Sequence, residues 1–233
     1  MALIFVTGSS TGLGLNTAAA LSADGHDVVV HARTTARLPH GTWYGTVIGD
    51  LSDPVQTVRA GQSANEYGRF DAVIHNAGAL HPPDAVRVNT IAPYLLTAVM
   101  IAPARLIYLS SSMHRGGSTD LTGLPSAAGS YSDSKLWVTA LSAAMSTRWS
   151  GTTTHAVDPG WVPTRMGGAG APDDLTEGHR TQTWLATTPD VTPVTGGYWH
   201  HHHTQHPAAA ANDTRFQARL LMELGDITGV PLP

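Results

Sequence analysis

"FVTGSSTGLGLNTAAALSADG", residues 5–25, places three glycines between a short apolar run and an alanine-rich segment. The apolar run predicts a buried strand, and the alanine-rich segment predicts a helix that begins near Gly12. Glycine permits backbone conformations and close approaches that a Cβ atom would block. The first turn of the helix offers unpaired N–H groups and the positive end of a dipole, which suits a pyrophosphate. The stretch therefore predicts a strand–turn–helix phosphate site, although a tight turn without a ligand would show the same pattern.

Outward from this stretch, short runs rich in β-branched residues alternate with helix-like segments along the chain. The predicted strands are 3–7, 27–32, 45–49, 71–76, 105–110, 152–158 and 196–201, and the predicted helices are 12–24, 53–66, 84–100, 131–149 and 213–224. Strands with little polar alternation are typical of a sheet that is covered on both faces, and strands that alternate with helices imply parallel crossovers. We therefore predict an α/β fold with one domain over residues 1–233: a doubly wound, Rossmann-like, seven-stranded, mostly parallel sheet.

The composition narrows the partners that this domain can have. The chain is 42% apolar and 13% charged, with a formal net charge of −4 and acidic and basic residues interspersed, so it lacks the basic footprint of a nucleic-acid-binding protein. It has no cysteine, which excludes disulfides and thiolate metal sites. No apolar run reaches membrane-spanning length, and "MALIFVTG" turns to glycine too early for a signal peptide. We expect a cytoplasmic protein without nucleic-acid or membrane partners.

"GSYSDSKLW" (129–137) contains the only lysine of the chain, since the other twelve of its 13 Lys and Arg residues are arginine. Tyr131 precedes Lys135 by four residues, so on a helix the two side chains share one face. A nearby ammonium lowers the pKa of a tyrosine, and a planar, forked guanidinium is a poor substitute for that compact charge. The pair therefore predicts an acid/base site in which a tyrosine gives or takes a proton; the alternative is a surface lysine on an ordinary helix.

Further motifs follow in order: "TGSSTGLG" (7–14), "GDLSD" (49–53), "HNAG" (75–78), "VNTIAPYLL" (88–96), "YLSSS" (108–112), "YSDSK" (131–135) and "DPGWVPTRM" (158–166). Together they resemble the short-chain dehydrogenase/reductase family along nearly the whole chain. The resemblance implies a dinucleotide site made of Gly8, Ser9, Ser10, Gly12, Leu13, Gly14, Arg33, Asp50, Leu51, Asn76, Ala77, Gly78, Tyr131, Lys135, Pro159, Gly160, Val162 and Thr164. Considered singly, Asp50 could cap the following helix and Asn76 could satisfy loop backbone groups.

The resemblance also implies a catalytic role for four residues. Tyr131 would be the acid/base, Lys135 would tune it, Ser111 would polarise the carbonyl oxygen and Asn89 would support a proton relay. Asn89 could instead be a polar residue that bends its helix by bonding to backbone.

The gap of 20 residues between Ser111 and Tyr131 is longer than the family usually shows. Ser118 would fit a shorter gap, but "RGGST" (115–119) is typical of a loop rather than of a strand end. We expect the longer loop to join the substrate pocket, with His114 either lining that pocket or facing solvent.

The end of the second strand, "DVVVHARTTAR" (27–37), indicates which dinucleotide is used. NAD enzymes place a carboxylate here to bind the ribose 2′-hydroxyl. This chain has Ala32 at that position, then Arg33, with Arg37 one turn further on. Arg33 can pair with a 2′-phosphate through charge-assisted bonds, so we expect NADP(H) to be favoured over NAD(H). The alternative is that Arg33 stacks on the adenine and serves both cofactors.

Two segments fall outside these motifs. The glycine- and proline-containing stretch 161–190 is expected to form a mobile cover over the substrate. The His-rich connection 200–207 holds four consecutive histidines, and an extended run would send alternate rings to opposite faces. Because a zinc site needs three or four convergent ligands, we favour a structural or pocket-rim role and expect no functional metal.

The sequence as a whole predicts an NADP(H)-dependent carbonyl reductase or alcohol dehydrogenase that acts on a small molecule. Helices 84–100 and 131–149 carry apolar residues on more than one face, which favours burial against a second subunit in a homodimer or homotetramer. Two rival functions stay open: a catalytically silent dinucleotide-binding scaffold or redox sensor, and a metal-dependent hydrolase or lyase built on the histidines.

Overall fold

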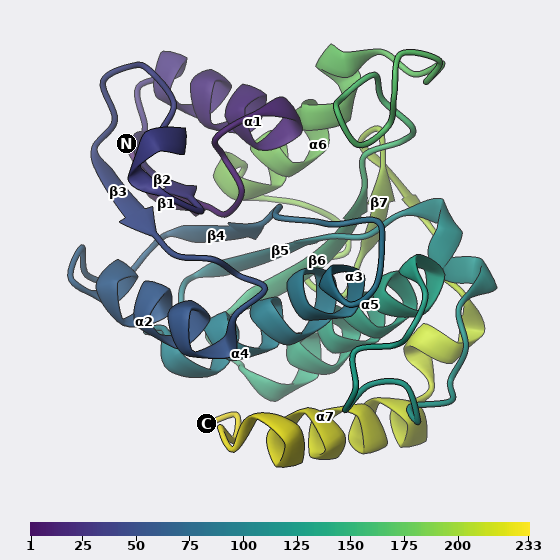
Figure 1. Cartoon of the computed structure of the whole chain (residues 1–233). Helices are drawn as coiled ribbons and strands as arrows, with labels where there is room; N and C mark the ends of the chain where they lie inside the picture. Colours follow the sequence, from purple (N-terminus) through teal and green to yellow (C-terminus); the bar gives the residue numbers. More distant parts are fainter.

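The computed structural model describes residues 1–233 and contains one eight-stranded sheet with the order β3-β2-β1-β4-β5-β6-β7-β8 (Figure 1). The strands are β1 Leu3–Val6, β2 Asp27–Ala32, β3 Gly45–Ile48, β4 Ala72–His75, β5 Arg105–Leu109, β6 Thr153–Asp158, β7 Tyr198–His200 and β8 His203–Gln205. The first seven pair in parallel, and β8 pairs antiparallel with β7. The predicted doubly wound sheet is confirmed. The eighth strand was not predicted because its three residues are all exposed and carry no apolar pattern.

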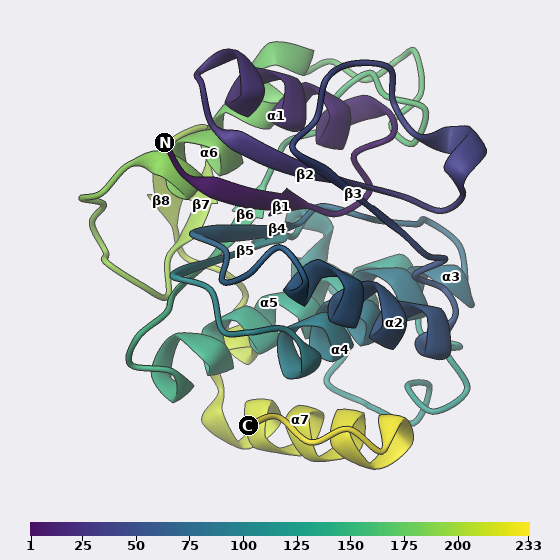
Figure 2. The ribbon, with the colours of Figure 1, turned by 90° about the vertical axis from the view of Figure 1, so that its left-hand side faces the viewer.

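Helices cover both faces of this sheet (Figures 1 and 2). They are α1 Gly12–Ala23, α2 Pro54–Asn65, α3 Asp84–Val86, α4 Ala92–Val99, α5 Tyr131–Arg148, α6 Leu175–Thr187 and α7 Thr214–Thr228, with a π-helical turn at Arg87–Ile91 and 3-10 turns at Thr35–Arg37, Ser112–Gly116 and Ala209–Asn212. Helices α1 and α6 lie on one face, and α2, α4 and α5 lie on the other. No helix has both the length and the apolar character needed to cross a membrane.

Helix α5, which carries the Tyr131–Lys135 pair, begins where the sequence predicts. The Ser130 hydroxyl accepts from the Asp133 amide at 3.1 Å, and the Asp133 carboxylate accepts from the Ser130 amide at 2.8 Å. This reciprocal capping satisfies two N–H groups that the helix itself leaves unpaired. The first turn of α5 is therefore well defined, and Tyr131 is its first residue.

The expectation for 161–190 needs correction, because its second half is not a cover. Helix α6 occupies 175–187 and packs against α1. Asp174 caps it by accepting from the amides of Thr176 and Glu177 at 2.6 and 3.2 Å. Burial of one side of this helix fixes it in the layer over the sheet, so only 161–174 remains as a loop beside the site. The glycines and prolines that suggested a cover are concentrated in that first half.

Helix α7 explains the second apolar face of α4 and α5. It packs outside α5 as a further layer, as Figure 2 shows, and buries Phe216, Leu220 and Leu224 in the same core as Trp137 and Leu141. The Tyr94 hydroxyl donates to the Val230 carbonyl at 2.7 Å and ties α4 to the end of the chain. The surface that led us to expect a second subunit is thus covered by the chain's own C-terminal helix, which runs four residues beyond the predicted 213–224.

The predicted helix 84–100 contains a widened, π-helical turn that holds Asn89. In an α-helix the Asn89 carbonyl would accept from the amide of residue 93, which is a proline and has no N–H. Such π-bulges occur frequently at functional sites. Pro93 therefore leaves the Asn89 carbonyl without its usual α-helical donor.

Candidate active site

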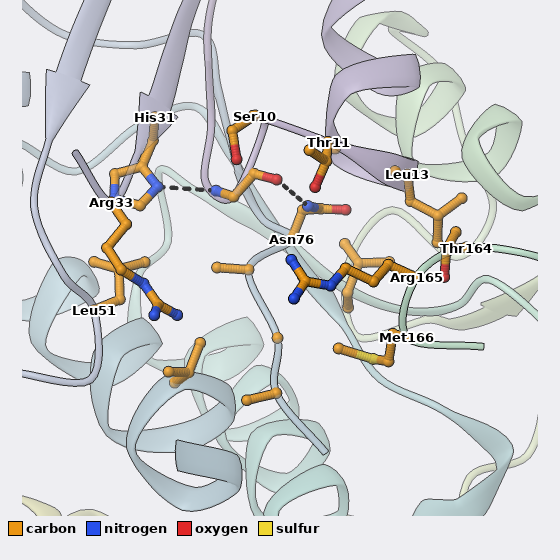
Figure 3. Close-up of a pocket in the computed structure, with 18 of the residues that line it drawn as sticks. Ser10, Thr11, Leu13, His31, Arg33, Leu51, Asn76, Thr164, Arg165 and Met166 are labelled. Atoms are coloured by element: carbon orange, nitrogen blue, oxygen red, sulfur yellow. Dashed lines mark hydrogen bonds between the residues drawn. The ribbon is translucent and has the colours of Figure 1, made fainter. Parts of the chain in front are cut away.

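A cavity of about 530 Å³ lies at the carboxyl ends of the strands and is shown in Figure 3. Ligands of open α/β sheets bind at this edge. Most of the predicted cofactor residues line it: Gly8, Ser10, Gly12, Leu13, Gly14, Arg33, Asp50, Leu51, Asn76, Ala77, Gly78, Tyr131, Lys135, Pro159 and Thr164. The structure thus brings together residues from six separate segments of the sequence around one space.

Three residues predicted to touch the cofactor do not line the cavity. Ser9 is fully buried, and its hydroxyl donates to the Val6 carbonyl at 2.8 Å and accepts from the His31 amide. Val162 is buried and packs against Gly178. The Gly160 amide donates to the Asp158 carboxylate. These residues shape the walls from behind instead.

The glycines of the first turn are required by space as well as by conformation. Gly8 and Gly12 have φ values of +64° and +60°. A Cβ atom on Gly14 would lie 2.3 Å from the side-chain Nδ2 of Asn76 and 2.5 Å from the Gly8 carbonyl oxygen. Real Cβ atoms do not approach other atoms so closely, so a larger residue at position 14 would push Asn76 out of place. The turn leaves the N-terminus of α1 facing the cavity, where its free N–H groups suit a phosphate.

Asn76 and Thr7 lock the turn after β1 to the loop after β4. The Asn76 side chain donates to the Thr7 carbonyl at 3.0 Å. The amides of Asn76 and Ala77 both donate to the Thr7 hydroxyl, at 2.9 and 3.0 Å. Asn76 therefore satisfies loop backbone groups, as the alternative interpretation held, and in doing so it holds the cavity floor in place.

His31 is a wall residue that the sequence analysis missed. The Gly8 amide donates to its Nδ1 at 3.0 Å, so its proton lies on Nε2, which donates to the Gly49 carbonyl at 2.9 Å (Figure 3). Burial lowers the pKa of His31 to about 4, against an opposing effect of the Gly49 hydrogen bond. The neutral ring thus joins the glycine turn, residues 8–14, to the end of β3. Its only sequence signal was a polar residue inside the apolar strand "DVVVHA".

Four cationic side chains and one carboxylate line the cavity: Arg33, Arg37, Lys135, Arg165 and Asp50. Figure 3 shows Arg33 and Arg165 extending into it from opposite walls. Arg33 lies 3.5 Å from the Asp50 carboxylate and keeps 56% of its side chain exposed. Arg165 was not predicted, although it directly follows Thr164 in the quoted motif. The cavity concentrates positive charge in a chain whose formal net charge is −4.

Tyr131 and Lys135 face each other one helical turn apart, with the Lys135 Nζ 5.6 Å from the centre of the Tyr131 ring. Lys135 is 4% exposed, and its Nζ donates to the Leu109 carbonyl at 2.7 Å. Burial lowers the pKa of Lys135 to about 8, while the charge of Asp158 raises it. Burial raises the pKa of Tyr131 to about 12; a hydrogen bond with Ser111 lowers it, and Asp158 raises it further.

Ser111 lies beside Tyr131 at the start of the 3-10 turn 112–116, where its hydroxyl also accepts from the Met113 amide at 3.3 Å. Ser118 is excluded from this position. Its amide donates to Asp133 at 2.7 Å, and its carbonyl accepts from the Trp137 ring N–H at 2.9 Å. The longer loop is thus tied to α5 rather than placed between Ser111 and Tyr131.

His114 neither lines the pocket nor faces solvent, contrary to both expectations. It is fully buried, and its Nε2 accepts from the Ala208 amide at 2.9 Å. The proton therefore lies on Nδ1, which donates to the Ser111 carbonyl at 2.7 Å. His114 supports Ser111 from behind, a role that depends on a contact with a distant part of the chain.

Asn89 uses its side chain entirely within the protein. Its Oδ1 accepts from the Ala79 amide at 2.8 Å, and its Nδ2 donates to the Ala79 carbonyl and the Ser134 hydroxyl, each at 2.9 Å. A proton relay at this position would therefore use the main-chain carbonyl of Asn89, because Pro93 has no N–H to donate to it.

The four histidines of 200–203 form a hairpin turn rather than an extended run. His201 and His202 have φ values of +46° and +65° and join β7 to β8. Two successive positive φ values are typical of a two-residue hairpin turn. His200 stacks on His201, and His202 packs on Trp184. The rings thus pack against each other and against α6, which supports the structural interpretation.

Comparisons with known proteins find relatives along the whole chain. A model of the family described as short chain dehydrogenase matches residues 2–92. An uncharacterized oxidoreductase of Emericella nidulans is 36% identical over 100% of this chain and 99% of its own. The short-chain dehydrogenase chyC of Penicillium rubens is 32% identical over the full length of both. A short chain dehydrogenase of Shigella flexneri, solved in complex with NADP, is 22% identical with a TM-score of 0.71, over 87% of this chain and 97% of its own.

Proposed function

Since this chain belongs to the short-chain dehydrogenase/reductase family, we propose that it is an NADP(H)-dependent oxidoreductase that interconverts a carbonyl compound and a secondary alcohol. The observation that carries the proposal is a buried lysine one turn from a tyrosine, both facing the cavity that the glycine turn also lines. The substrate would be a small molecule that reaches Tyr131 from the 161–174 side.

The cavity suits a dinucleotide. The glycine turn and Asn76 form a floor with no room for a Cβ atom at position 8 or 14, and the N-terminus of α1 lies beside it. Asp50 and Leu51 line the end where the adenine would lie, and Pro159 and Thr164 line the nicotinamide end. When bound there, the nicotinamide supplies the hydride for reduction or accepts it in oxidation.

The chain's own residues handle the proton. Tyr131 keeps its proton at neutral pH because burial raises its pKa to about 12, so in reduction it can donate that proton to the developing alkoxide. The Lys135 ammonium favours the phenolate that results and limits the cost of the transfer. The Ser111 hydroxyl supplies a neutral donor where negative charge grows at the carbonyl oxygen. The Asn89 carbonyl is the acceptor through which a water could return the proton to Tyr131.

Positive charge supports the phosphorylated cofactor. Arg33 and Arg37 line the end of the cavity nearest β2, where the adenosine ribose would lie. The end of β2 carries Ala32 where an NAD enzyme would have a carboxylate. Asp50 lies in the loop after β3 and pairs with Arg33. A 2′-phosphate would compete with Asp50 for the guanidinium and offers the stronger, charge-assisted partner.

The test is oxidation of NADPH by purified protein across a panel of aliphatic and aromatic ketones and aldehydes, followed by absorbance. Tyr131→Phe keeps the ring and removes the proton donor, so turnover should fall by at least about 100-fold while NADPH binding is kept. Lys135→Arg should lose most of its activity although the charge stays. If no member of the panel is reduced faster than with Tyr131→Phe, the chain would be a silent dinucleotide-binding scaffold. Loss of activity on chelation would favour a metal enzyme.

A further inference from the structure

Asp158 is a buried carboxylate that takes no part in the proposed proton transfer. It ends β6 and is 5% exposed. Its Oδ1 accepts from the Gly160 amide at 3.0 Å, and its Oδ2 accepts from the Tyr198 hydroxyl at 3.3 Å. A buried ionised carboxylate is costly unless it is paired with a cation or hydrogen-bonded. Two neutral donors hold it, and a nearby cation would favour its ionised form further.

Lys135 is a buried cation that reaches the neighbouring strand, β5, from helix α5. Its ammonium bonds the Leu109 carbonyl, and in the β5–β6 register Leu109 pairs with Val157, the residue before Asp158. The lysine and the carboxylate therefore approach the end of the same strand pair from α5 and from β6. No carboxylate oxygen lies within ion-pair distance of Lys135. The negative charge of Asp158 nevertheless raises the pKa values of Lys135, Tyr131 and His114.

Other ionisable groups around Asp158 are poorer partners. His114 keeps a neutral tautomer between Ser111 and Ala208. The His200 Nδ1 is 4.0 Å from the Asp158 carboxylate, but it is a cation only when protonated. Arg115 lies over the Tyr198 ring, 6.0 Å from its centre, and donates to the His206 carbonyl. Lys135, with a pKa of about 8, is thus the buried group near this carboxylate that carries a positive charge at neutral pH.

We propose that Asp158 is the buried counter-charge of the Lys135 ammonium, held in place by Tyr198 and Gly160, and that it acts as a positioning residue for the Tyr131–Lys135 pair. The electrostatic part rests on the shared strand end and on the effect of the Asp158 charge on the Lys135 pKa; only its consequence for turnover rests on the proposed function. A chain with a carboxylate directly before Pro159 can bury its lysine deeply and still keep it charged.

The single lysine makes a direct test possible. Protein grown with lysine labelled with carbon-13 at the ε-carbon gives one side-chain signal, and its shift with pH reports the titration of Lys135 alone. Asp158→Asn keeps the side-chain shape and removes the charge, so the titration midpoint should fall by about one pH unit, the lower end of the effect of a nearby charge. Tyr198→Phe keeps the carboxylate charge, so its midpoint should stay near that of the parent.

Asp213→Asn is the matched control, because Asp213 accepts from the Arg215 and Phe216 amides at the start of α7, away from the cavity. It should leave the Lys135 midpoint unchanged. Asp158→Ser, which keeps an acceptor for the Gly160 amide, replaces Asp158→Asn should that variant not fold. An unchanged midpoint in the charge-removing variant would overturn the proposal even with normal turnover.

The catalytic consequence is read separately. In Asp158→Asn the high-pH limb of kcat/KM for carbonyl reduction should move to lower pH together with the Lys135 midpoint, while a purely structural role would lower stability and leave the profile in place. If the midpoint moves and no substrate is turned over, the proposed function fails and the counter-charge stands.

Discussion

Removal of the Arg33 side chain tests the assignment of the cofactor most directly. In the structure the guanidinium is 56% exposed and lies 3.5 Å from the Asp50 carboxylate. A hydrogen bond to a charged group contributes about 1.5–3 kcal/mol. To reach a 2′-phosphate, Arg33 must give up an exposed ion pair that is worth roughly 0.5–1 kcal/mol. The net contribution to NADPH binding is then about 1–2 kcal/mol, which corresponds to about 5- to 30-fold.

The assay is kcat/KM for NADPH and for NADH with one carbonyl substrate, at a fixed and stated ionic strength. Arg33→Ala should lose about 5- to 30-fold with NADPH and change little with NADH. Asp50→Asn removes the competing carboxylate and should raise the efficiency with NADPH by up to about fivefold. Arg215→Ala, an exposed arginine on α7, is the control for loss of a positive charge elsewhere.

Two results would refute this reasoning. Equal efficiency of the parent with NADPH and NADH would mean that Arg33 does not select the phosphate. A parental cofactor ratio in Arg33→Ala would mean that the arginine only stacks on the adenine.

Acid should destabilise the fold, because burial lowers the pKa values of His31 and His155 to about 4 and of His75 to about 3. These rings stay neutral in the folded state while the unfolded chain binds protons, so their contribution is complete above about pH 6.5 and is lost as the pH falls toward 4. Urea unfolding at pH 5 should give a free energy lower by about 2 kcal/mol per histidine than at pH 7.5; equal values would contradict the burial of neutral rings. Light scattering should give the mass of one chain, 24.4 kDa, because α7 covers the face that a partner would need. Leu220→Ala should cost about 3 kcal/mol of stability without changing that mass, and a stable dimer of the parent would show that another surface associates.

The parts of the site that the sequence predicted are those set by short-range chemistry. The glycine turn needs small residues at fixed spacing, and the Tyr131–Lys135 pair needs only one helical turn, so both can be recognised in a linear string. Arg33 follows from its place just after a strand. His31, His114 and Asp158 were missed or misplaced because their roles depend on groups brought close only by the fold: the Gly49 carbonyl, the Ala208 amide and the Lys135 ammonium.

The same distinction applies to two predictions at the level of whole elements. Helix α6 was taken for a cover because glycines and prolines dominate the residues before it, and because its buried side mixes polar residues, Thr181 and Gln182, with Leu185. The apolar second face of α5 was assigned to another subunit because sequence shows that a face must be covered but not by what. The chain supplies that cover itself, with a helix that lies almost at its end.

The survival of one lysine among twelve arginines follows from how deeply position 135 is buried. An ammonium has three N–H donors on a compact head, whereas a guanidinium has five in a planar fork. The structure offers the Lys135 head one protein acceptor, the Leu109 carbonyl, and leaves the rest of it facing the cavity beside Tyr131. A guanidinium there would leave more donors without partners, at about 1–3 kcal/mol for each buried one. The carboxylate of Asp158 favours a buried cation at this point, and the single carbonyl acceptor suits an ammonium better than a guanidinium.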